Sequence, residues 1–270
     1  MSNIKISAIY EKFIQIGQDI ALQECTGGYP DKEDCSWYHG NWMLLRYLGV
    51  VSNPYWHEDF YRYALKYVKA NDKENFLVAG TADFSMPLFC SEIGVRKIHI
   101  CDICETPLKI CNLVSEYLKY DWTTFVQDIC IEMPLKYDII INDAFLSRFI
   151  DKITVLKGIS NSIKKGGYYI TTLKQGKWNS GGDITDLAKE SFVRKVKERY
   201  DKNKEYLPSI NIDEISKTYI NKMSSFPVLD EKEIYELFND VGLNIIYLEK
   251  GDVEGEFEAS NYFRIISQKQ

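Results

Sequence analysis

Four positions in the sequence combine residue types and spacing that suit a nucleotide-like ligand. The apolar segment F-L-V-A-G-T-A-D (residues 76–83) runs into a turn of small residues at Gly80, which brings backbone N–H groups and a helix N-terminus close to a ligand. About twenty residues further on, K-I-H-I-C-D ends in Asp102, an acid placed to accept hydrogen bonds from ribose hydroxyls. Two further acids, Asp128 and Asp143, also follow apolar segments. This series predicts a site for an adenosine-type ligand.

A parallel sheet is the element that would bring these residues together. From residue 76 onward, short apolar segments alternate with segments of helical periodicity, which predicts strand–helix–strand units with right-handed crossovers. The expected strands span residues 76–80, 97–102, 123–127, 137–142, 168–173, 244–249 and 261–267. The expected helices between them span residues 84–93, 106–120, 151–164, 184–204, 212–223 and 231–241. The last two strands are joined by a Gly/Glu-rich turn, so we expect them to be antiparallel to each other.

The chain before this sheet has a different character. Apolar residues recur at steps of three or four along residues 4–24, 35–48 and 56–68, which predicts three helices. Ser36 is the expected N-cap of the second helix. We therefore expect a helical appendage over residues 1–70, rich in Trp, Tyr and His. Residues 71–270 would form the ligand-binding domain, with a helical insertion at about residues 175–229.

Composition limits the class of protein. The 270 residues are 45% hydrophobic and 27% charged, which is ordinary globular usage. A net charge of −6 without a dense basic run argues against a nucleic-acid partner. No apolar run approaches the roughly 18 residues that span a bilayer, and the first residues show no secretory h-region. The seven scattered cysteines fit a reducing cytoplasm better than a disulfide framework. We expect a cytoplasmic monomer or homodimer that binds a small molecule, with no nucleic-acid or membrane partner.

The order of strands and acids resembles the class I S-adenosylmethionine (SAM)-dependent methyltransferase family over residues 75–268. The resemblance implies an α/β, Rossmann-like, seven-stranded, mostly parallel sheet with an antiparallel last strand, and it implies SAM as the cofactor. The first motif of that family, E/D-x-G-x-G-x-G, is represented here by V-A-G-T-A-D, including Thr81. Only Gly80 is retained, Ala82 stands at the second glycine, and the first acid is missing. The amino group of the cofactor would then be held by the appendage.

The other family motifs follow in order. The resemblance assigns the ribose hydroxyls to Asp102 and the adenine amino group to Asp128, with Ile129 against the ring. The segment N-D-A-F (residues 142–145) matches the fourth-strand motif, and I-K-K-G-G-Y (residues 163–168) matches the segment before strand five. The cofactor-binding residues expected on this basis are Gly80, Thr81, Ala82, Asp102, Ile103, Asp128, Ile129, Asn142 and Asp143.

An aromatic cluster in the appendage is the candidate for the other side of the site. Trp37, Tyr38, His39 and Trp42 either pack the appendage onto the sheet or form a lid over the strand ends. A sulfonium is a cation, and aromatic faces attract cations by roughly 0.5–2 kcal/mol. His39, with a reference pKa of about 6.5, is a candidate general base, and Tyr38 is a second candidate for the chemistry.

Three further side chains are candidates for contact with a substrate. Asp143 could position an amine nucleophile or act as a base, and Arg148 could pair with a substrate carboxylate through its planar guanidinium. A surface salt bridge is the alternative for Arg148. Trp178 lies in a polar loop that follows the fifth expected strand, where a substrate would be covered.

The C-x-x-C segment formed by Cys101 and Cys104 has the spacing of a redox or metal motif. However, the acid between the two thiols disfavours the thiolate that redox chemistry needs. A zinc site would require a second pair at suitable spacing, and Cys111 and Cys130 do not form one. The sequence therefore predicts no metal.

Methyl transfer from SAM to a nitrogen or oxygen of a small molecule is the function that these patterns favour. A SAM-consuming cyclase or lyase that releases methylthioadenosine is the first alternative, and an NAD-dependent oxidoreductase is the second. A non-catalytic binding module is also consistent with the sequence. Products formed from SAM alone, and the relative affinities for NADH and S-adenosylhomocysteine (SAH), would separate these possibilities.

Overall fold

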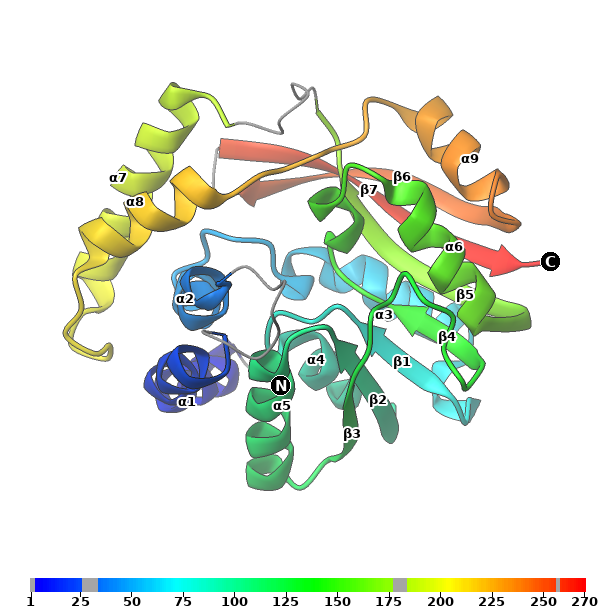
Figure 1. Cartoon of the computed structure of the whole chain (residues 1–270), viewed down its shortest axis with the longest axis horizontal. Coiled ribbons are helices and arrows are strands. Elements are labelled where there is room, and N and C mark those ends of the chain that lie inside the picture. Colours follow the sequence, from blue (N-terminus) through cyan, green and yellow to red (C-terminus); the bar gives the residue numbers. More distant parts are fainter. Residues whose placement is uncertain (1–2, 26–33, 177–183, 256–257) are drawn as a thin grey trace.

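The computed structural model describes residues 3–25, 34–176, 184–255 and 258–270. Within them, one seven-stranded sheet has the strand order β3-β2-β1-β4-β5-β7-β6 (Figure 1). The strands are β1 (Phe76–Ala79), β2 (Lys97–Asp102), β3 (Asp121–Val126), β4 (Tyr137–Ile141), β5 (Ile163–Lys174), β6 (Leu243–Gly255) and β7 (Glu258–Lys269). Strands β1 to β5 pair in parallel, whereas β7 is antiparallel to both of its neighbours. This confirms the predicted fold class.

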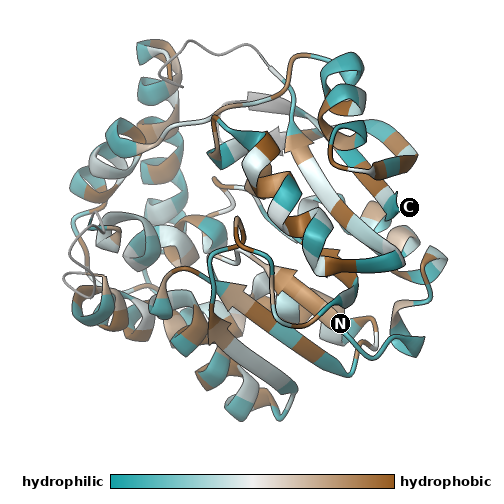
Figure 2. Cartoon of the chain, turned by 45° about the vertical axis from the view of Figure 1, so that its right-hand side comes forward, coloured by the Kyte–Doolittle hydropathy of each residue, from teal (hydrophilic) through white to brown (hydrophobic). Residues whose placement is uncertain are grey.

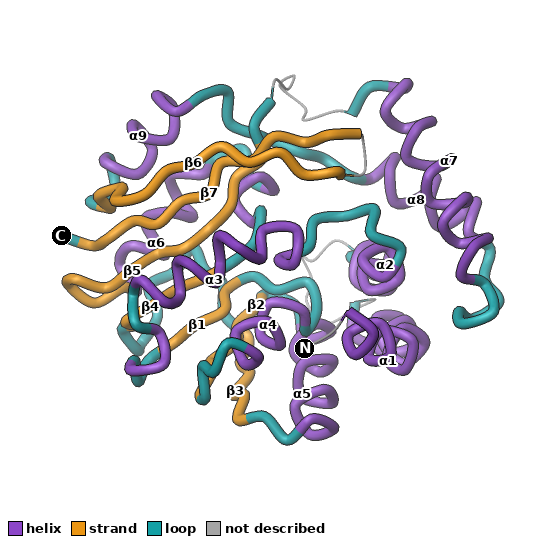
Figure 3. The backbone as a smooth tube through the Cα atoms, turned by 180° about the vertical axis from the view of Figure 1, so that it is seen from behind, coloured by secondary structure: helices purple, strands orange, loops and turns teal. Residues whose placement is uncertain are grey.

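Helices cover both faces of the sheet. They are α1 (Asn3–Glu24), α2 (Ser36–Tyr47), α3 (Glu58–Tyr67), α4 (Ser85–Glu92), α5 (Glu105–Leu118), α6 (Lys152–Ser162), α7 (Asp186–Asn203), α8 (Ile212–Lys222) and α9 (Glu231–Asn239). Helices α6 and α9 lie on the face nearer the viewer in Figure 1, and α3 and α4 lie on the opposite face (Figure 3). Helices α1, α2, α7 and α8 gather beside the sheet. None of the described helices is long and apolar enough to cross a membrane.

Side-chain alternation along the strands separates the two largest hydrophobic clusters of the described interior. Phe76 and Val78 belong to the cluster that contains residues of α1 to α5, and Leu77 and Ala79 belong to the cluster that contains residues of α6 and α9. All four side chains of β1 are buried, because helices cover both faces. Figure 2 shows the apolar colour on the inner strands and much hydrophilic colour on the outlying α7.

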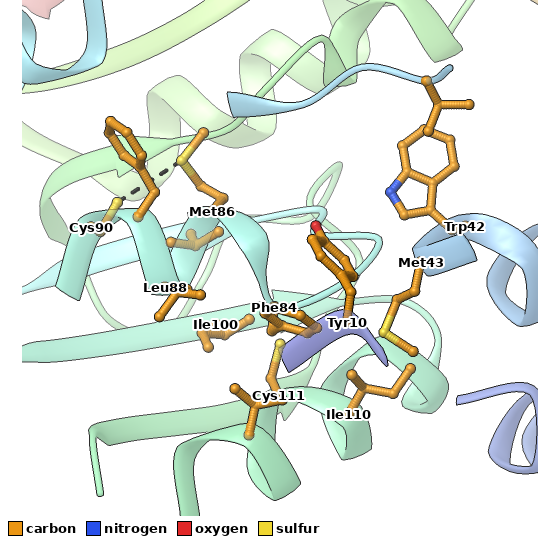
Figure 4. Close-up of a cluster of buried hydrophobic side chains, with 14 of the residues drawn as sticks. Tyr10, Trp42, Met43, Phe84, Met86, Leu88, Cys90, Ile100, Ile110 and Cys111 are labelled. Atoms are coloured by element: carbon orange, nitrogen blue, oxygen red, sulfur yellow. Dashed lines mark hydrogen bonds between the residues drawn. The ribbon is translucent and has the colours of Figure 1, made fainter. Parts of the chain in front are cut away.

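The N-terminal helices are packed directly against the helices of the sheet. The ring of Tyr10 on α1 lies 4.8 Å from that of Phe84, between centroids, and Met43 on α2 lies nearby (Figure 4). Helices α1 and α2 also approach closely, since a Cβ on Gly17 would stand 2.1 Å from the terminal methyl of Met43. Residues of α1, α2 and the sheet therefore share one continuous cluster.

The boundaries of several elements differ from expectation. Cys35, not Ser36, is the N-cap residue of α2, and Asp34 accepts the Ser36 N–H at 2.8 Å. Strand β5 begins at Ile163 instead of residue 168, and β6 and β7 form a longer hairpin than predicted. In each strand, pairing with a neighbour extends regular structure through polar residues that show no strand pattern by themselves.

One buried histidine links the appendage to β7. His57 is 1% exposed, its ring lies 4.7 Å from that of Tyr262, and its Nδ1 accepts a hydrogen bond from Arg264 Nε at 3.4 Å. Burial lowers the pKa of His57 to about 4, although the nearby Asp143 carboxylate opposes this shift. His57 is therefore folded into the protein in its neutral form.

Neutral burial of His57 makes stability depend on pH. The unfolded histidine binds a proton at about pH 6.5 and the folded one only at about pH 4, so its stabilisation is full above pH 6.5 and is lost as the pH falls toward 4. When the pH is lowered from 7 to 4.5, the wild type should lose unfolding free energy because of His57, and His57→Gln should not. We expect the loss in the wild type to be about 2–3 kcal/mol larger than the loss in His57→Gln. Urea unfolding at both pH values measures this difference, and parallel losses in the two proteins would contradict it.

Candidate functional site

Two adjoining pockets lie at the carboxyl ends of the parallel strands, and Gly80 and Phe145 line both of them. The carboxylate pocket is lined by Gly80, Asp102, Ile103, Gln127, Asp128, Ile129, Phe145 and Phe149. The aromatic pocket lies between the ends of β1 and β4, helix α2 and the segment after α8. Its lining residues include Tyr38, Trp42, Arg46, Ser52, Thr81, Ala82, Asn142, Asp143, Arg148, Lys174 and Met223.

The same local turn orients both acids of the carboxylate pocket. Asp102 and Asp128 each begin the tripeptide D-I-C at the end of neighbouring strands β2 and β3. In each turn one carboxylate oxygen accepts the backbone N–H two residues on, at 2.8 Å from Cys104 and 2.9 Å from Cys130. These Asx turns fix the two side chains. The two carboxylates therefore line one pocket.

The walls between these acids are apolar. Ile103 is 54% exposed, although it is a large hydrophobic side chain, and Ile129 lies almost fully buried across the pocket. The Phe149 ring completes the wall and lies 4.9 Å from the ring of Phe145. Apolar walls with a few convergent polar groups are typical of small-molecule sites. This pocket suits a flat ring system with hydrogen-bond donors at its edges.

The conformation of Gly80 serves a close contact with an aromatic ring. Its φ is +66°, and a Cβ at this position would lie 2.1 Å from the Phe145 ring. Any other residue would therefore be strained and would collide with Phe145. Ala82 is not among the described residues with positive φ, so its side chain is tolerated where the family pattern has glycine. The ring of Phe145 thus borders both pockets at the glycine turn.

A buried ion pair joins α2 to the segment after the glycine turn. Arg46 Nη1 lies 2.5 Å from Asp83 Oδ1, and the side chains are 5% and 0% exposed. Asp83 also accepts the Ser85 N–H at 2.8 Å, and Arg46 Nε donates to the Ser52 carbonyl at 2.7 Å. Burial by itself would lower the pKa of Arg46, but the nearby acidic groups, Asp83 first and Asp143 among the others, together outweigh burial and raise that pKa. The pair fixes α2 over the strand ends.

Asp143 is held by three hydroxyl groups. Ser52 donates to one carboxylate oxygen at 2.5 Å, and Tyr61 and Thr172 donate to the other at 3.1 and 2.9 Å. The next residue, Ala144, has a φ of +51°, which is uncommon for a residue with a Cβ. Such conformations concentrate at functional sites, where the surrounding structure maintains them. The turn after β4 therefore places a hydrogen-bonded carboxylate on the pocket surface.

Aromatic and cationic side chains form the opposite wall. The guanidinium of Arg148 lies 5.2 Å from the ring centroid of Tyr38, and that of Arg46 lies 5.1 Å from the ring centroid of Trp42. Arg148 also donates to the Ser224 carbonyl at 2.8 Å. Burial raises the pKa of Tyr38 to about 12, so this phenol is protonated at neutral pH. Tyr38 can donate a hydrogen bond there, but it is not a base.

The structure places most of the predicted site residues around these two pockets. Two are elsewhere, and one lies outside the described residues. His39 is buried among cysteines, with its Nδ1 3.6 Å from Cys25 Sγ, and it does not line either pocket. Trp37 packs against Tyr219 of α8, with ring centroids 5.7 Å apart. Trp178 lies outside the described residues.

Sequence reasoning missed several residues of the aromatic pocket. Arg46 is one of them, although it follows Trp42 by four positions on the apolar stripe of a helix. A single charge on an apolar stripe signals a buried partner, because an unpaired charge is costly to bury. No sequence pattern indicates that Ser52, Tyr61 and Thr172 donate hydrogen bonds to Asp143. They come from three segments that meet only in the folded chain.

The fold is similar to that of solved SAM-dependent methyltransferases. One from Methanosarcina mazei is 17% identical over 74% of this chain and 93% of that chain, with a TM-score of 0.51. The magnesium protoporphyrin IX methyltransferase of Synechocystis PCC 6803, solved with bound SAH, is 13% identical over 98% of this chain and 99% of that chain, with a TM-score of 0.51. No family model and no curated protein matches the sequence. The chain has the class I SAM-dependent methyltransferase fold.

Breaking the buried ion pair is expected to destabilise the protein strongly. Arg46→Met leaves the Asp83 carboxylate buried without its cation, which costs about 3–5 kcal/mol in unfolding free energy. The matched control is Arg62→Met, which removes an arginine from an exposed i,i+4 pair with Glu58 and should cost less than about 1 kcal/mol. Urea unfolding of both variants tests this expectation. Equal losses of unfolding free energy in the two variants would show that the buried pair stabilises the protein no more than the exposed pair does.

Proposed function

We propose that this chain is a SAM-dependent methyltransferase that acts on a nitrogen or oxygen of a small molecule. The observation that supports this most is the convergence of Asp102 and Asp128 on one pocket that meets a second pocket at Gly80 and Phe145. The first pocket suits an adenosine group, and the second offers room for an acceptor. The net charge of −6 and the enclosed aromatic wall favour a small acceptor in the cytoplasm over nucleic acid.

In this proposal the carboxylate pocket holds the adenosyl group. Asp102 accepts hydrogen bonds from the ribose hydroxyls, and Asp128 accepts one from the adenine amino group. Ile103 and Ile129 supply apolar surface for the ring. The backbone at Gly80, Thr81 and Ala82 borders the methionine portion of the cofactor, which supplies a methyl group on a cationic sulfur. These residues bind and orient; none of them needs to change its protonation state.

The aromatic pocket would then align the acceptor. Asp143 accepts a hydrogen bond from the acceptor N–H or O–H, and the hydroxyls of Ser52, Tyr61 and Thr172 keep its carboxylate in place. Alignment and exclusion of water supply much of the rate in such a displacement. Tyr38 donates a hydrogen bond from its protonated phenol, and Arg148 attracts an anionic group on the acceptor. His39 has no role in this chemistry.

The helices outside the sheet would act as covers. Helix α2 from residues 1–70 and the segment after α8, within residues 175–229, supply Tyr38, Trp42 and Met223 to the aromatic pocket. This arrangement favours a domain organisation in which the appendage and the insertion enclose the acceptor. Enclosure would exclude water from the reacting groups and limit the size of the acceptor.

The acids of the carboxylate pocket provide the first test of this function. Loss of one charge-assisted hydrogen bond costs about 1.5–3 kcal/mol, so Asp102→Asn should weaken SAH binding by roughly 10- to 150-fold. The control is Asp121→Asn, which makes the same chemical change at the exposed amino end of β3 and should leave affinity unchanged. Isothermal titration calorimetry measures both. No binding of SAH by the wild type, together with tight binding of NADH, would favour the oxidoreductase alternative.

The products formed from SAM provide the second test. With methyl-labelled SAM and a panel of small amines, phenols and carboxylates, we expect label in one acceptor and an equal amount of SAH. The control is Asp143→Asn, which should retain SAH binding but lose most of the turnover. Methylthioadenosine formed without any acceptor would contradict methyl transfer. It would favour the cyclase alternative, with which the missing acid of the first motif is also consistent.

A further inference from the structure

Four metal-ligating side chains meet at the junction of the appendage and the sheet. Cys25 follows the end of α1, Cys35 is the N-cap residue of α2, His39 lies one turn into α2, and Cys104 is the N-cap residue of α5. Their ligand atoms all lie within 4.8 Å of one another. Among the residues that the structure describes, this is the one group with such a composition and spacing.

Three of the six ligand-to-ligand distances in this group match the edges of a zinc tetrahedron. Zn–S bonds of about 2.3 Å and Zn–N bonds of about 2.0–2.1 Å require edges of about 3.8 Å between two sulfurs and about 3.6 Å between sulfur and nitrogen. Cys104 Sγ lies 3.7 Å from Cys25 Sγ and 3.8 Å from Cys35 Sγ. Cys25 Sγ lies 3.6 Å from His39 Nδ1. A disulfide, in contrast, has sulfurs about 2.05 Å apart.

The local backbone and surroundings also suit a metal centre. Cys35 and His39 stand four residues apart on one face of α2, joined by the helical hydrogen bond from the His39 N–H to the Cys35 carbonyl at 3.0 Å. Cys25, His39 and Cys104 are buried. The Thr106 hydroxyl lies 3.1 Å from Cys25 Sγ, where it can donate to a thiolate. Such outer hydrogen bonds orient ligands and stabilise their charge.

We propose that Cys25, Cys35, His39 and Cys104 bind one structural Zn²⁺ through three thiolates and one imidazole. Three soft sulfur ligands and a nitrogen in tetrahedral arrangement select zinc over the oxygen-preferring cations. Four protein ligands complete the coordination, so the site offers no position for a substrate. Binding of Zn²⁺ releases the protons of the three thiols to solvent, and it requires no change of oxidation state.

The sequence alone predicted no metal, because the C-x-x-C pair of Cys101 and Cys104 has no second cysteine pair at suitable spacing. The partners of Cys104 are instead supplied by the appendage, in the arrangement C-x9-C-x3-H at residues 25–39. Cys101 itself is buried in β2, in the hydrophobic cluster that contains Leu77 and Ala79, and it is not part of the group around Cys104.

The proposed zinc joins both walls of the candidate site. Cys104 lies two residues after Asp102 and donates its backbone N–H to that carboxylate. His39 is adjacent to Tyr38, which lines the aromatic pocket. The metal would therefore fix the α1–α2 pair to the turn after β2. This inference does not depend on the proposed methyl transfer, since it concerns the metal content of the chain.

Metal analysis of the purified full-length protein tests the proposal. We expect inductively coupled plasma mass spectrometry to detect about one zinc ion per chain. X-ray absorption should show three sulfur neighbours at about 2.3 Å and one nitrogen at about 2.0–2.1 Å. Alkylation under denaturing conditions with a chelator and no reductant should modify all seven cysteines. Less than one-tenth equivalent of zinc, both as purified and after addition of Zn²⁺, would overturn the proposal. A disulfide among Cys25, Cys35 and Cys104 would overturn it as well.

Matched variants separate the proposed ligands from other cysteines. Cys104→Ser should lose zinc, whereas Cys130→Ser, at the equivalent place in the second D-I-C turn, should retain it. His39→Ala should lose zinc, but His39→Cys should retain it, because a fourth thiolate can replace the imidazole. Zinc retained in Cys104→Ser, or lost equally from Cys130→Ser, would contradict the assignment. SAH titration of the same samples reports on the proposed function separately, since either result can occur without the other.

Discussion

The buried pair between Arg46 and Asp83 is the interaction on which the candidate site depends. It connects a helix of the appendage to the segment after the first strand, and burial makes the loss of either partner costly. Through this contact α2 is fixed where its aromatic side chains can wall a pocket at the strand ends. The methyltransferase family pattern has an acid before the glycine turn. This chain instead has Asp83 after the turn, where it pairs with Arg46.

The parallel sheet supplies the second constraint. Neighbouring strands that end at one edge bring side chains separated by many residues into one pocket, and identical Asx turns orient Asp102 and Asp128 there. The same edge carries Asp143, whose oxygens accept hydrogen bonds from three hydroxyls. The three carboxylates thus have different surroundings. Asp102 and Asp128 border the carboxylate pocket with its apolar walls, and Asp143 lines the aromatic pocket.

The cysteine and histidine cluster adds a further connection between these parts. It lies where α1 and α2 meet the start of α5, beside Asp102 of the carboxylate pocket. The ion pair and the proposed zinc would hold α2 at two places, one near each end of the helix. A fixed position of α2 would favour the proposed reaction, because a reaction that depends on alignment of the reactants slows when the residues that line the pocket move.

The sequence by itself determined the strand–helix alternation, the seven-stranded sheet and the acids at the strand ends, because these depend on local periodicity and on the rule that parallel strands share an edge. Only the tertiary structure decided which side chains surround those acids. Arg46 with Asp83, Ser52 with Asp143, and Cys25 with Cys104 are far apart in the sequence. Such pairs follow from the packing of α1 and α2 on the sheet, which no local pattern encodes. For the same reason His39, predicted as a base, lies among cysteines instead.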